Sequence, residues 1–216
     1  MDAQPPTNHA VVFFDGFQAL DAFGPLDVLN LLSLKAQHRI SLSVLRPQEG
    51  AVPTLAPGLG LTIGQSVLPT HSFANAPPEI EVLLVPGALG TRDTKATQPV
   101  VDLVRKIFPK LRFLLTVCTG AALAARTGVL SSKRATSNKL ALEWVVSQDP
   151  GNDVRWVRRA RWVQDGNVWT ASGVSAGMDM MYAFVAAHYG EDVAASIAAT
   201  AEYTRNTHPT NDPFSF

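Results

Sequence analysis

The chain of 216 residues contains one cysteine, Cys118, and the sequence around it is typical of a catalytic nucleophile. An apolar run of strand length, RFLLTV, precedes the cysteine, and a strong helix former, AALAAR, follows it and is closed by Gly128. The order of strand, sharp turn, nucleophile and helix is that of a nucleophile elbow. Such a turn holds a side chain clear of the sheet, so we expect Cys118 to be a reactive thiol.

The helix that starts behind Cys118 would lower the pKa of the thiol, because its first N–H groups and its positive dipole end stabilise a thiolate. The N–H of Thr119 could also donate to charge that develops on a substrate. Gly120 lets the chain turn without steric cost. The alternative is that Cys118 packs as a small hydrophobic residue, which is the usual fate of a lone cysteine.

Alternating strands and helices must position this thiol. Apolar runs of strand length occupy residues 10–15, 39–47, 81–87 and 112–117, and a short strand covers 134–136. Helical patterns occupy 20–34, 99–108, 121–126, 139–147 and two terminal segments that are split near Gly190. The Gly/Pro-rich stretch 51–66 predicts a hairpin or an irregular excursion, and residues 155–172 predict two strands joined at Asp165-Gly166.

This alternation predicts an α/β protein with a mostly parallel central sheet that is covered on both faces. Ligands of such sheets bind beyond the carboxyl ends of the strands, where Cys118 lies. The sequence shows no repeat and no shift in composition. We therefore expect a single domain over residues 1–216, with a core over 10–203 and an irregular tail over 204–216.

Charge and hydropathy argue against several classes of function. The 18 basic and 18 acidic residues cancel, so no global field attracts nucleic acid or anionic lipid. No apolar run reaches the length that crosses a bilayer, and the polar, Pro-rich start does not read as a secretory signal. The lone cysteine cannot form an intrachain disulfide, which fits a reducing compartment. We expect a soluble, cytoplasmic protein that does not bind membranes.

Two further patterns have ordinary explanations. The predicted hairpin interleaves tryptophans with arginines, as a nucleic-acid platform does, at Arg155, Trp156, Arg158, Arg159, Arg161 and Trp162. We expect these arginines to lie on a solvated side and predict no nucleic-acid partner. The five histidines show no metal-ligand spacing, so we expect no metal, and His188 is explained by its place near a helix C-terminus.

Four segments carry a family resemblance, and they are FFDGFQALDAFGPLDVL, VPGALG, LLTVCTGAALAARTGVLSSKRAT and WTASGVSAGMDM. In this order and at these separations they resemble the ThiJ/PfpI superfamily of class I glutamine amidotransferase-like proteins, and within it the isocyanide (isonitrile) hydratase branch. The resemblance covers residues 10–203. The first and third segments are the specific ones.

The resemblance implies a flavodoxin-like three-layer sandwich, a homodimer, and Cys118 as the nucleophile at the elbow. Asp21 matches an aspartate that faces the cysteine in the hydratase branch, and Thr119 matches its threonine. The implied reaction hydrates an isocyanide, a small-molecule substrate, to an N-substituted formamide through a Cys118 thioimidate. Asp21 is the general acid and base, and no metal or organic cofactor is needed. From the residues alone, Asp21 could instead be a helix N-cap.

A carboxyl group that faces a thiolate should hold its proton tightly, because two nearby negative charges repel each other. We therefore expect Asp21 and Cys118 to titrate as a coupled pair.

The sequence departs from the family pattern at two positions. Ala88 stands where many relatives have a second glycine after the Pro-Gly turn, so the backbone geometry there is in question. Asn138 stands where relatives often carry a histidine, so a Cys-His pair lacks its base.

Other residues are expected to surround the thiol. The N–H groups of Gly87 and Ala88 should flank the nucleophile, unless they form only an ordinary turn. Ser172, Gly173 and Val174, together with Asn138, should form a wall of the pocket. The alternative for this segment is helix capping by Ser175. Asp179 is explained as a helix-dipole partner.

Two competing functions stay open. One is a glyoxalase- or deglycase-like activity on methylglyoxal, which usually pairs the cysteine with glutamate and histidine. The other is a non-enzymatic redox or stress sensor, because a reactive thiolate is prone to oxidation.

Overall fold

Continuous apolar runs form the buried strands of the computed structural model, which describes residues 4–36 and 39–215. His38 and the two ends of the expected domain, 1–3 and 216, lie outside the described residues. The strands are β1 (Asn8–Val12), β2 (Ser41–Arg46), β3 (Val52–Pro53), β4 (Ser66–Val67), β5 (His71–Ser72), β6 (Val82–Val85), β7 (Phe113–Val117), β8 (Arg134–Ala135), β9 (Arg155–Trp156), β10 (Trp162–Asp165) and β11 (Val168–Ala171).

Seven of these strands form the central sheet, in the order β10-β11-β7-β6-β1-β2-β5. Neighbouring strands run parallel, except that β10 and β11 pair antiparallel. The predicted, mostly parallel α/β sheet is therefore confirmed. The register places Val85 of β6 opposite Thr116 of β7, so the turn after β6 meets the residue that follows β7, which is Cys118.

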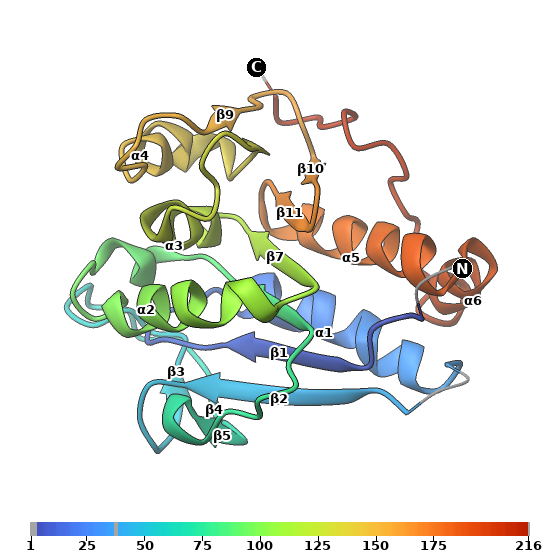
Figure 1. Cartoon of the computed structure of the whole chain (residues 1–216), viewed down its shortest axis with the longest axis horizontal. Helices are drawn as coiled ribbons and strands as arrows, with labels where there is room; N and C mark the ends of the chain where they lie inside the picture. The colour runs from blue at the N-terminus through green and yellow to red at the C-terminus, as the bar shows by residue number, and fades with distance from the viewer. Residues whose placement is uncertain (1–3, 37–38, 216) are drawn as a thin grey trace.

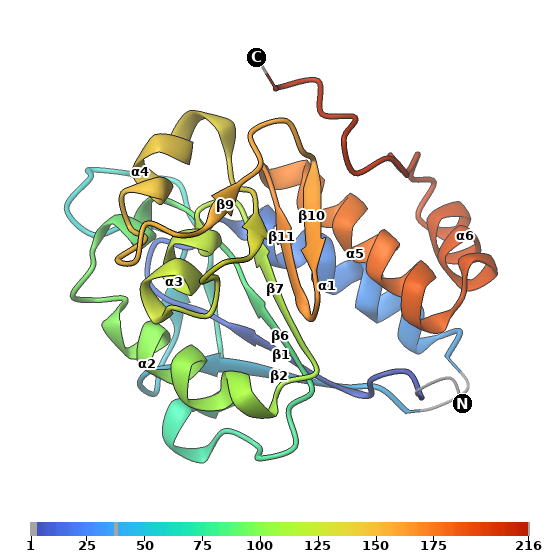
Figure 2. The same ribbon diagram turned by 45° about the horizontal axis from the view of Figure 1, so that its top comes forward.

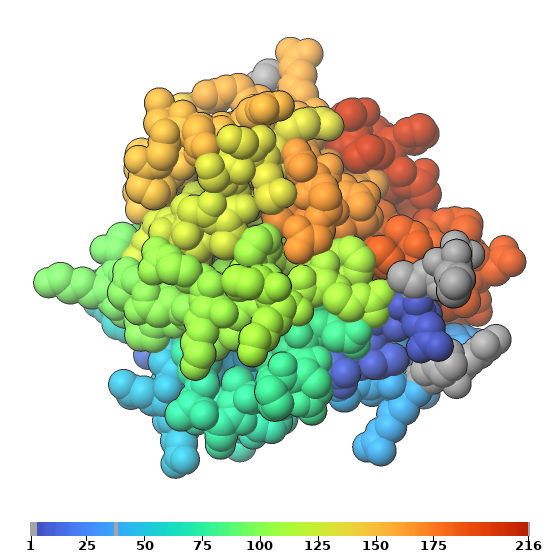
Figure 3. Space-filling model, in the orientation of Figure 1, coloured from blue at the N-terminus to red at the C-terminus, as the bar shows by residue number. Residues whose placement is uncertain are grey.

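Helices cover both faces of the sheet (Figures 1 and 2). On one face α1 (Ala19–Ser33), α5 (Val174–Tyr189) and α6 (Glu191–Thr200) pack against one another; on the other lie α2 (Gln98–Ile107) and α3 (Gly120–Thr127), with α4 (Leu142–Val146) against α3. This is the expected flavodoxin-like three-layer sandwich. In the space-filling view, the side chains of the green segment around α2 and α3 and those of the yellow and orange segments next to it form one continuous surface (Figure 3).

Two segments outside the regular layers differ in how well the sequence described them. The stretch 51–66 is irregular apart from the antiparallel β3–β4 pair, as expected. The predicted hairpin has its turn at Asp165-Gly166, but its first strand is interrupted. β9 leaves it to pair with β8 in a separate small sheet, because the backbone of 157–161 bends away and Arg161 turns inward.

Neither a membrane span nor a metal cluster is found among the described residues. No helix of residues 4–36 and 39–215 is long and apolar enough to cross a membrane. In the same part of the chain, no three His, Cys, Asp or Glu side chains are grouped so that they could hold a metal ion. That the site around Cys118 works without a metal stays a prediction.

Under α5, a buried histidine forms a polar contact that no pattern in the sequence predicts. His9 on β1 is 2% exposed, and its Nε2 lies 2.9 Å from the Tyr189 hydroxyl. That hydroxyl donates to the carbonyl of Pro6, so Nε2 must be the atom of His9 that carries the proton. Nδ1 then has no hydrogen-bond partner among the described residues. Burial lowers the pKa of His9 from 6.5 to about 4, because a proton on Nδ1 would be neither solvated nor paired.

We therefore predict that His9 makes the protein acid-sensitive. The unfolded chain takes up this proton near pH 6.5 and the folded protein only near pH 4, so its contribution is complete above pH 6.5 and is lost as the pH falls towards 4. The loss amounts to about 3 kcal/mol. Urea unfolding at several pH values should show a shallower acid-side loss in His9→Gln, which keeps a donor for Tyr189. Equal slopes in the two proteins would rule this out.

Candidate active site

The sharp turn at Cys118 has the geometry of an elbow. Cys118 follows β7 directly and has a positive φ of 57°, a conformation that costs energy in a non-glycine residue. Two contacts hold it there: its N–H donates to the carbonyl of Ala171 on the neighbouring strand (3.1 Å), and the Ser137 hydroxyl donates to its carbonyl (2.6 Å). The residue is 8% exposed.

Two glycines let the elbow approach the end of β6 closely. A Cβ on Gly120 would lie 2.2 Å from the carbonyl oxygen of Val85, and a Cβ on Gly87 would lie 2.4 Å from the backbone nitrogen of Thr119. Both glycines are thus required by close packing of two backbones. Gly120 thus avoids a steric clash at the turn, as expected, while the residue of the turn with a positive φ is Cys118.

Asp21 projects from the first turn of α1 towards this elbow. Its side chain is fully buried, and its Oδ2 accepts a hydrogen bond from the N–H of Gly87 (3.1 Å). Oδ1 has no hydrogen-bond partner of ordinary geometry among the described residues. The alternative role as a helix N-cap is wrong, because α1 begins at Ala19 and Gln18 occupies the cap position.

Burial, rather than the helix dipole, dominates the electrostatics of this pair. It raises the pKa of Asp21 to about 7, against the opposing effects of the Gly87 N–H and the Cys118 thiol. It also raises the pKa of Cys118 to about 12, helped by the negative charge of Asp21 and opposed by the N–H and hydroxyl of Thr119. The expected lowering of the thiol pKa is therefore wrong for this state. The raised pKa of Asp21 has the expected direction, but burial is its main cause.

Thr119 joins the elbow to the turn that follows β6. Its hydroxyl accepts from the N–H of Ala88 (2.8 Å) and from the Thr91 hydroxyl (3.1 Å), and it lies 3.1 Å from the carbonyl of Ala88. The N–H groups of Gly87 and Ala88 therefore already donate to Asp21 and Thr119. They hold these two side chains in place, and a direct role of these N–H groups beside the nucleophile stays a prediction.

The expected pocket wall divides into two parts. Asn138 lies beside Gly173, since its Nδ2 would be 3.3 Å from a Cβ on that glycine, while its Oδ1 caps the short helix η4 (Lys139–Ala141). Val174 begins α5 and Gly173 precedes it as the cap residue; Ser175 lies within the helix and is not the cap. Ser172 instead donates its hydroxyl to Asp212 of the C-terminal segment.

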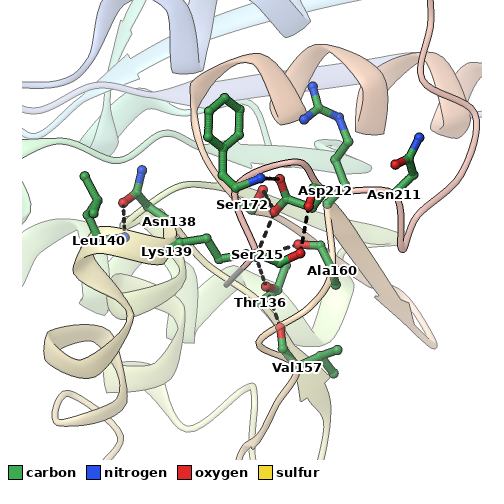
Figure 4. A network of polar contacts seen from close by, with 12 residues as sticks. Thr136, Asn138, Lys139, Leu140, Val157, Ala160, Ser172, Asn211, Asp212 and Ser215 are labelled. Atoms are coloured by element: carbon green, nitrogen blue, oxygen red, sulfur yellow. Dashed lines mark hydrogen bonds and ion pairs between the residues drawn. The ribbon is translucent and has the colours of Figure 1, made fainter.

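A buried ion pair ties this C-terminal segment to the loop that carries Ser137 (Figure 4). Lys139 Nζ lies 3.1 Å from Asp212 Oδ2, and it also donates to the Thr136 hydroxyl (3.3 Å) and the Ala160 carbonyl (2.6 Å). The Lys139 and Asp212 side chains are only 9% and 1% exposed. Together with Ser172, this pair connects three segments next to the elbow.

A second buried pair corrects two sequence-based assignments. Arg161, expected on a solvated side, is 7% exposed and donates through Nε to Asp179 Oδ2 at 2.6 Å. Asp179 also accepts from the Tyr203 hydroxyl and the Asn206 N–H, so it anchors the C-terminal segment instead of complementing the helix dipole. Trp162 is 5% exposed and offers no stacking surface for a base.

Sequence reasoning missed two side chains that hold the site. Ser137 and Thr91 are fully buried, and their hydroxyls reach the Cys118 carbonyl and the Thr119 hydroxyl. Neither lies in a residue pattern with a chemical meaning, and only the fold brings them to the elbow.

Ala88 is strained, and this generates a prediction. Its φ of 148° and ψ of −164° lie in a region that is nearly restricted to glycine and costs about 1–3 kcal/mol in other residues. Ala88→Gly should therefore stabilise the protein by about 1 kcal/mol after the greater chain entropy of glycine is subtracted. Urea unfolding checks this, with Ala201→Gly as the control, because exposed Ala201 has an ordinary φ of −82°. Equal effects of the two substitutions would contradict the strain.

The Lys139–Asp212 pair generates a second prediction. Asp212→Asn leaves the Lys139 charge buried without its partner, so it should lower the free energy of unfolding by about 3 kcal/mol. The double variant Lys139→Met/Asp212→Leu should recover most of this loss, because it removes both charges. Glu143→Gln breaks the exposed pair with Arg158 and should leave unfolding unchanged. A loss that the double variant does not recover would argue against charge as the cause.

Comparison with known proteins identifies relatives of the chain in sequence and in fold. The model of the DJ-1/PfpI family matches residues 9–187. Isonitrile hydratase from Pseudomonas putida is 27% identical over 194 residues, which are 89% of this chain and 76% of that protein. A THiJ/PfpI family protein from Pseudomonas syringae superposes with a TM-score of 0.77 at 21% identity, over 97% of this chain and 78% of that one. For Drosophila melanogaster DJ-1beta the TM-score is 0.73 at 21% identity, over 92% and 100%.

The two superpositions extend over nearly the whole chain and show that the fold is shared. The family match runs from β1 into the last turn of α5 and contains both Asp21 and Cys118. The chain therefore belongs to the DJ-1/PfpI family.

Proposed function

We propose that the protein hydrates an isocyanide to an N-substituted formamide without a cofactor, with Cys118 as nucleophile and Asp21 as general acid and base. The observation that carries this proposal is the buried carboxyl group of Asp21, which lies beside the Cys118 thiol and has a pKa raised to about 7. The similarity to an isonitrile hydratase supports the choice of substrate class. No histidine is needed, which suits a site with Asn138 at the position where relatives often carry one.

In the first step, Asp21 takes the proton of the Cys118 thiol while the sulfur bonds to the terminal carbon of R–N≡C. The same proton then passes from Asp21 to that carbon, which gives the thioimidate S–CH=N–R. Because a carboxyl group with a pKa near 7 is easily protonated and deprotonated at neutral pH, it suits both transfers. Thr119 stabilises the sulfur while it is negative, since its N–H and hydroxyl both favour the thiolate.

In the second step, Asp21 takes a proton from water, whose oxygen bonds to the thioimidate carbon, and passes this proton to the nitrogen. The tetrahedral intermediate S–CH(OH)–NH–R then loses the sulfur as a leaving group and the hydroxyl proton, and releases H–CO–NH–R. Cys118 recovers its proton, so the sum is one isocyanide plus one water. The N–H of Gly87 holds the Asp21 carboxyl group in position through its hydrogen bond to Oδ2.

Asn138, Gly173 and Val174 are proposed to form a wall of the substrate site, since the first two lie side by side at the end of β11. Following the resemblance, we also propose that the protein works as a homodimer in the cytoplasm.

The two competing functions have less support. The glyoxalase- or deglycase-like reaction usually uses glutamate and histidine, and the corresponding regions hold Asp21 and Asn138. A peroxide sensor needs a thiolate at neutral pH, but the pKa of Cys118 is raised in this state.

Turnover of cyclohexyl isocyanide, followed as formamide, tests the proposal, with methylglyoxal and lactate as the parallel assay. Cys118→Ala should lower kcat/KM by more than about 1,000-fold, and Asp21→Asn by about 100- to 10,000-fold. In the wild type, kcat/KM should rise with pH through about 7, because the carboxylate form of Asp21 accepts the thiol proton. This rise should be absent in Asp21→Asn.

Asp27→Asn is the matched control, because Asp27 is exposed on the same helix and should leave kcat/KM unchanged. The covalent mechanism is wrong if Cys118→Ala keeps full turnover. Lactate without formamide would favour the glyoxalase-like alternative, and stoichiometric oxidation of Cys118 by mild peroxide without either product would favour the sensor.

A further inference from the structure

A large cavity lies at the carboxyl ends of β1 and β2, and none of the proposed catalytic residues lines it. Its volume is about 710 Å³, which is ample for a small organic ligand. The walls are largely apolar, with contributions from Phe14 after β1, Pro57 of the irregular excursion, and Leu89 of the short helix η2 (Leu89–Arg92). In open α/β sheets this edge is where ligands bind.

The charged groups of the cavity are not balanced. Three cationic side chains line it, from Arg46, Arg92 and Lys95, and two carboxylates, from Asp15 and Asp93. The carboxylate of Asp15 lies 3.7 Å from Arg46.

The second carboxylate, that of Asp93, accepts hydrogen bonds from the N–H groups of Lys95 (3.1 Å) and Ala96 (2.9 Å). Among the residues that the structure describes, neither Arg92 nor the Lys95 ammonium group has a carboxylate within 4.0 Å. Two cations of the cavity are therefore left for an anionic ligand.

Arg92 lies in the wall of the cavity over an aromatic ring. Arg92 is exposed, and its guanidinium carbon lies 3.7 Å from the centroid of the Trp144 ring, a cation–π contact that holds the group over the indole. A guanidinium group can bind a carboxylate through two parallel hydrogen bonds, so Arg92 suits an anionic ligand.

The same short helix joins the cavity to the elbow. Thr91 of η2 donates to the Thr119 hydroxyl, while its neighbours Gly90 and Arg92 line the cavity. Thr91 alone therefore separates Gly90 and Arg92 in the cavity wall along the chain, and its hydroxyl contacts the residue that follows Cys118. The cavity and the elbow are therefore adjacent through η2.

We infer that this cavity binds a small organic anion through Arg92 and Lys95, and that this anion is the carboxylate end of the substrate. The inference rests on the proposed function for its reactive end: the substrate class becomes an isocyanide that carries a carboxylate. The apolar lining of the cavity takes the carbon chain of the substrate.

A binding measurement tests the anion site independently of catalysis. Hexanoate should change the tryptophan fluorescence saturably, because Trp144 lies under Arg92, whereas neutral hexanamide should not. Arg92→Gln should weaken hexanoate binding about tenfold. Arg159→Gln, which removes an exposed charge elsewhere, should leave binding unchanged. Equal responses to hexanoate and hexanamide, or unaltered hexanoate binding by Arg92→Gln, would overturn the anion site.

Kinetics then test the substrate class. Isocyano carboxylates of two to six carbons are compared with their methyl esters, and at the best chain length kcat/KM should favour the carboxylate about tenfold. Arg92→Gln should reduce this ratio to about one. A ratio near one at every length in the wild type would overturn the substrate class while the proposed reaction stands. Absence of formamide from carboxylates, esters and cyclohexyl isocyanide alike would instead refute the proposed reaction, and the hexanoate measurement would still decide the anion site.

Discussion

The close approach of the elbow to the turn after β6 is the constraint on which the rest of the site depends. Gly87 and Gly120 leave no room for a Cβ, so the two backbones meet with nothing between them. From this contact the turn supplies two N–H groups, one to Asp21 and one to Thr119. Gly87 therefore positions Asp21 of α1, and the next residue, Ala88, positions Thr119 of the elbow, although Asp21 and Thr119 are far apart in the sequence.

Depth of burial determines how this arrangement holds its protons. An elbow at a helix start is expected to favour a thiolate, since helix N–H groups and the dipole stabilise negative charge. Here desolvation outweighs that effect, and it raises the pKa values of Cys118 and Asp21 together. The free site therefore keeps its thiol at neutral pH, and nucleophilicity arises only when the carboxylate form of Asp21 removes the proton.

The sequence predicted the fold well because its signals are local. Uninterrupted apolar runs specified the parallel strands, and Gly128 ended α3 as expected. Predictions failed where a side chain's role depends on distant partners. Arg161 and Asp179 lie in segments that read as solvated hairpin and helix start, yet they meet in a buried pair that only tertiary packing creates. Likewise Cys118 was correctly placed at an elbow, whereas its burial depends on neighbouring segments that no local pattern describes.

The absence of a histidine at position 138 is consistent with the proposed chemistry. A Cys-His pair suits acyl transfer, in which a proton taken from the nucleophile is given to a separate leaving group. Addition to an isocyanide is different, because the carbon that gains the sulfur also gains the proton. One group that accepts the proton and returns it over a short path is then sufficient, and a single carboxyl group with a pKa of about 7 meets this need. Asn138 is left free to cap η4 beside Gly173, and so to shape the site.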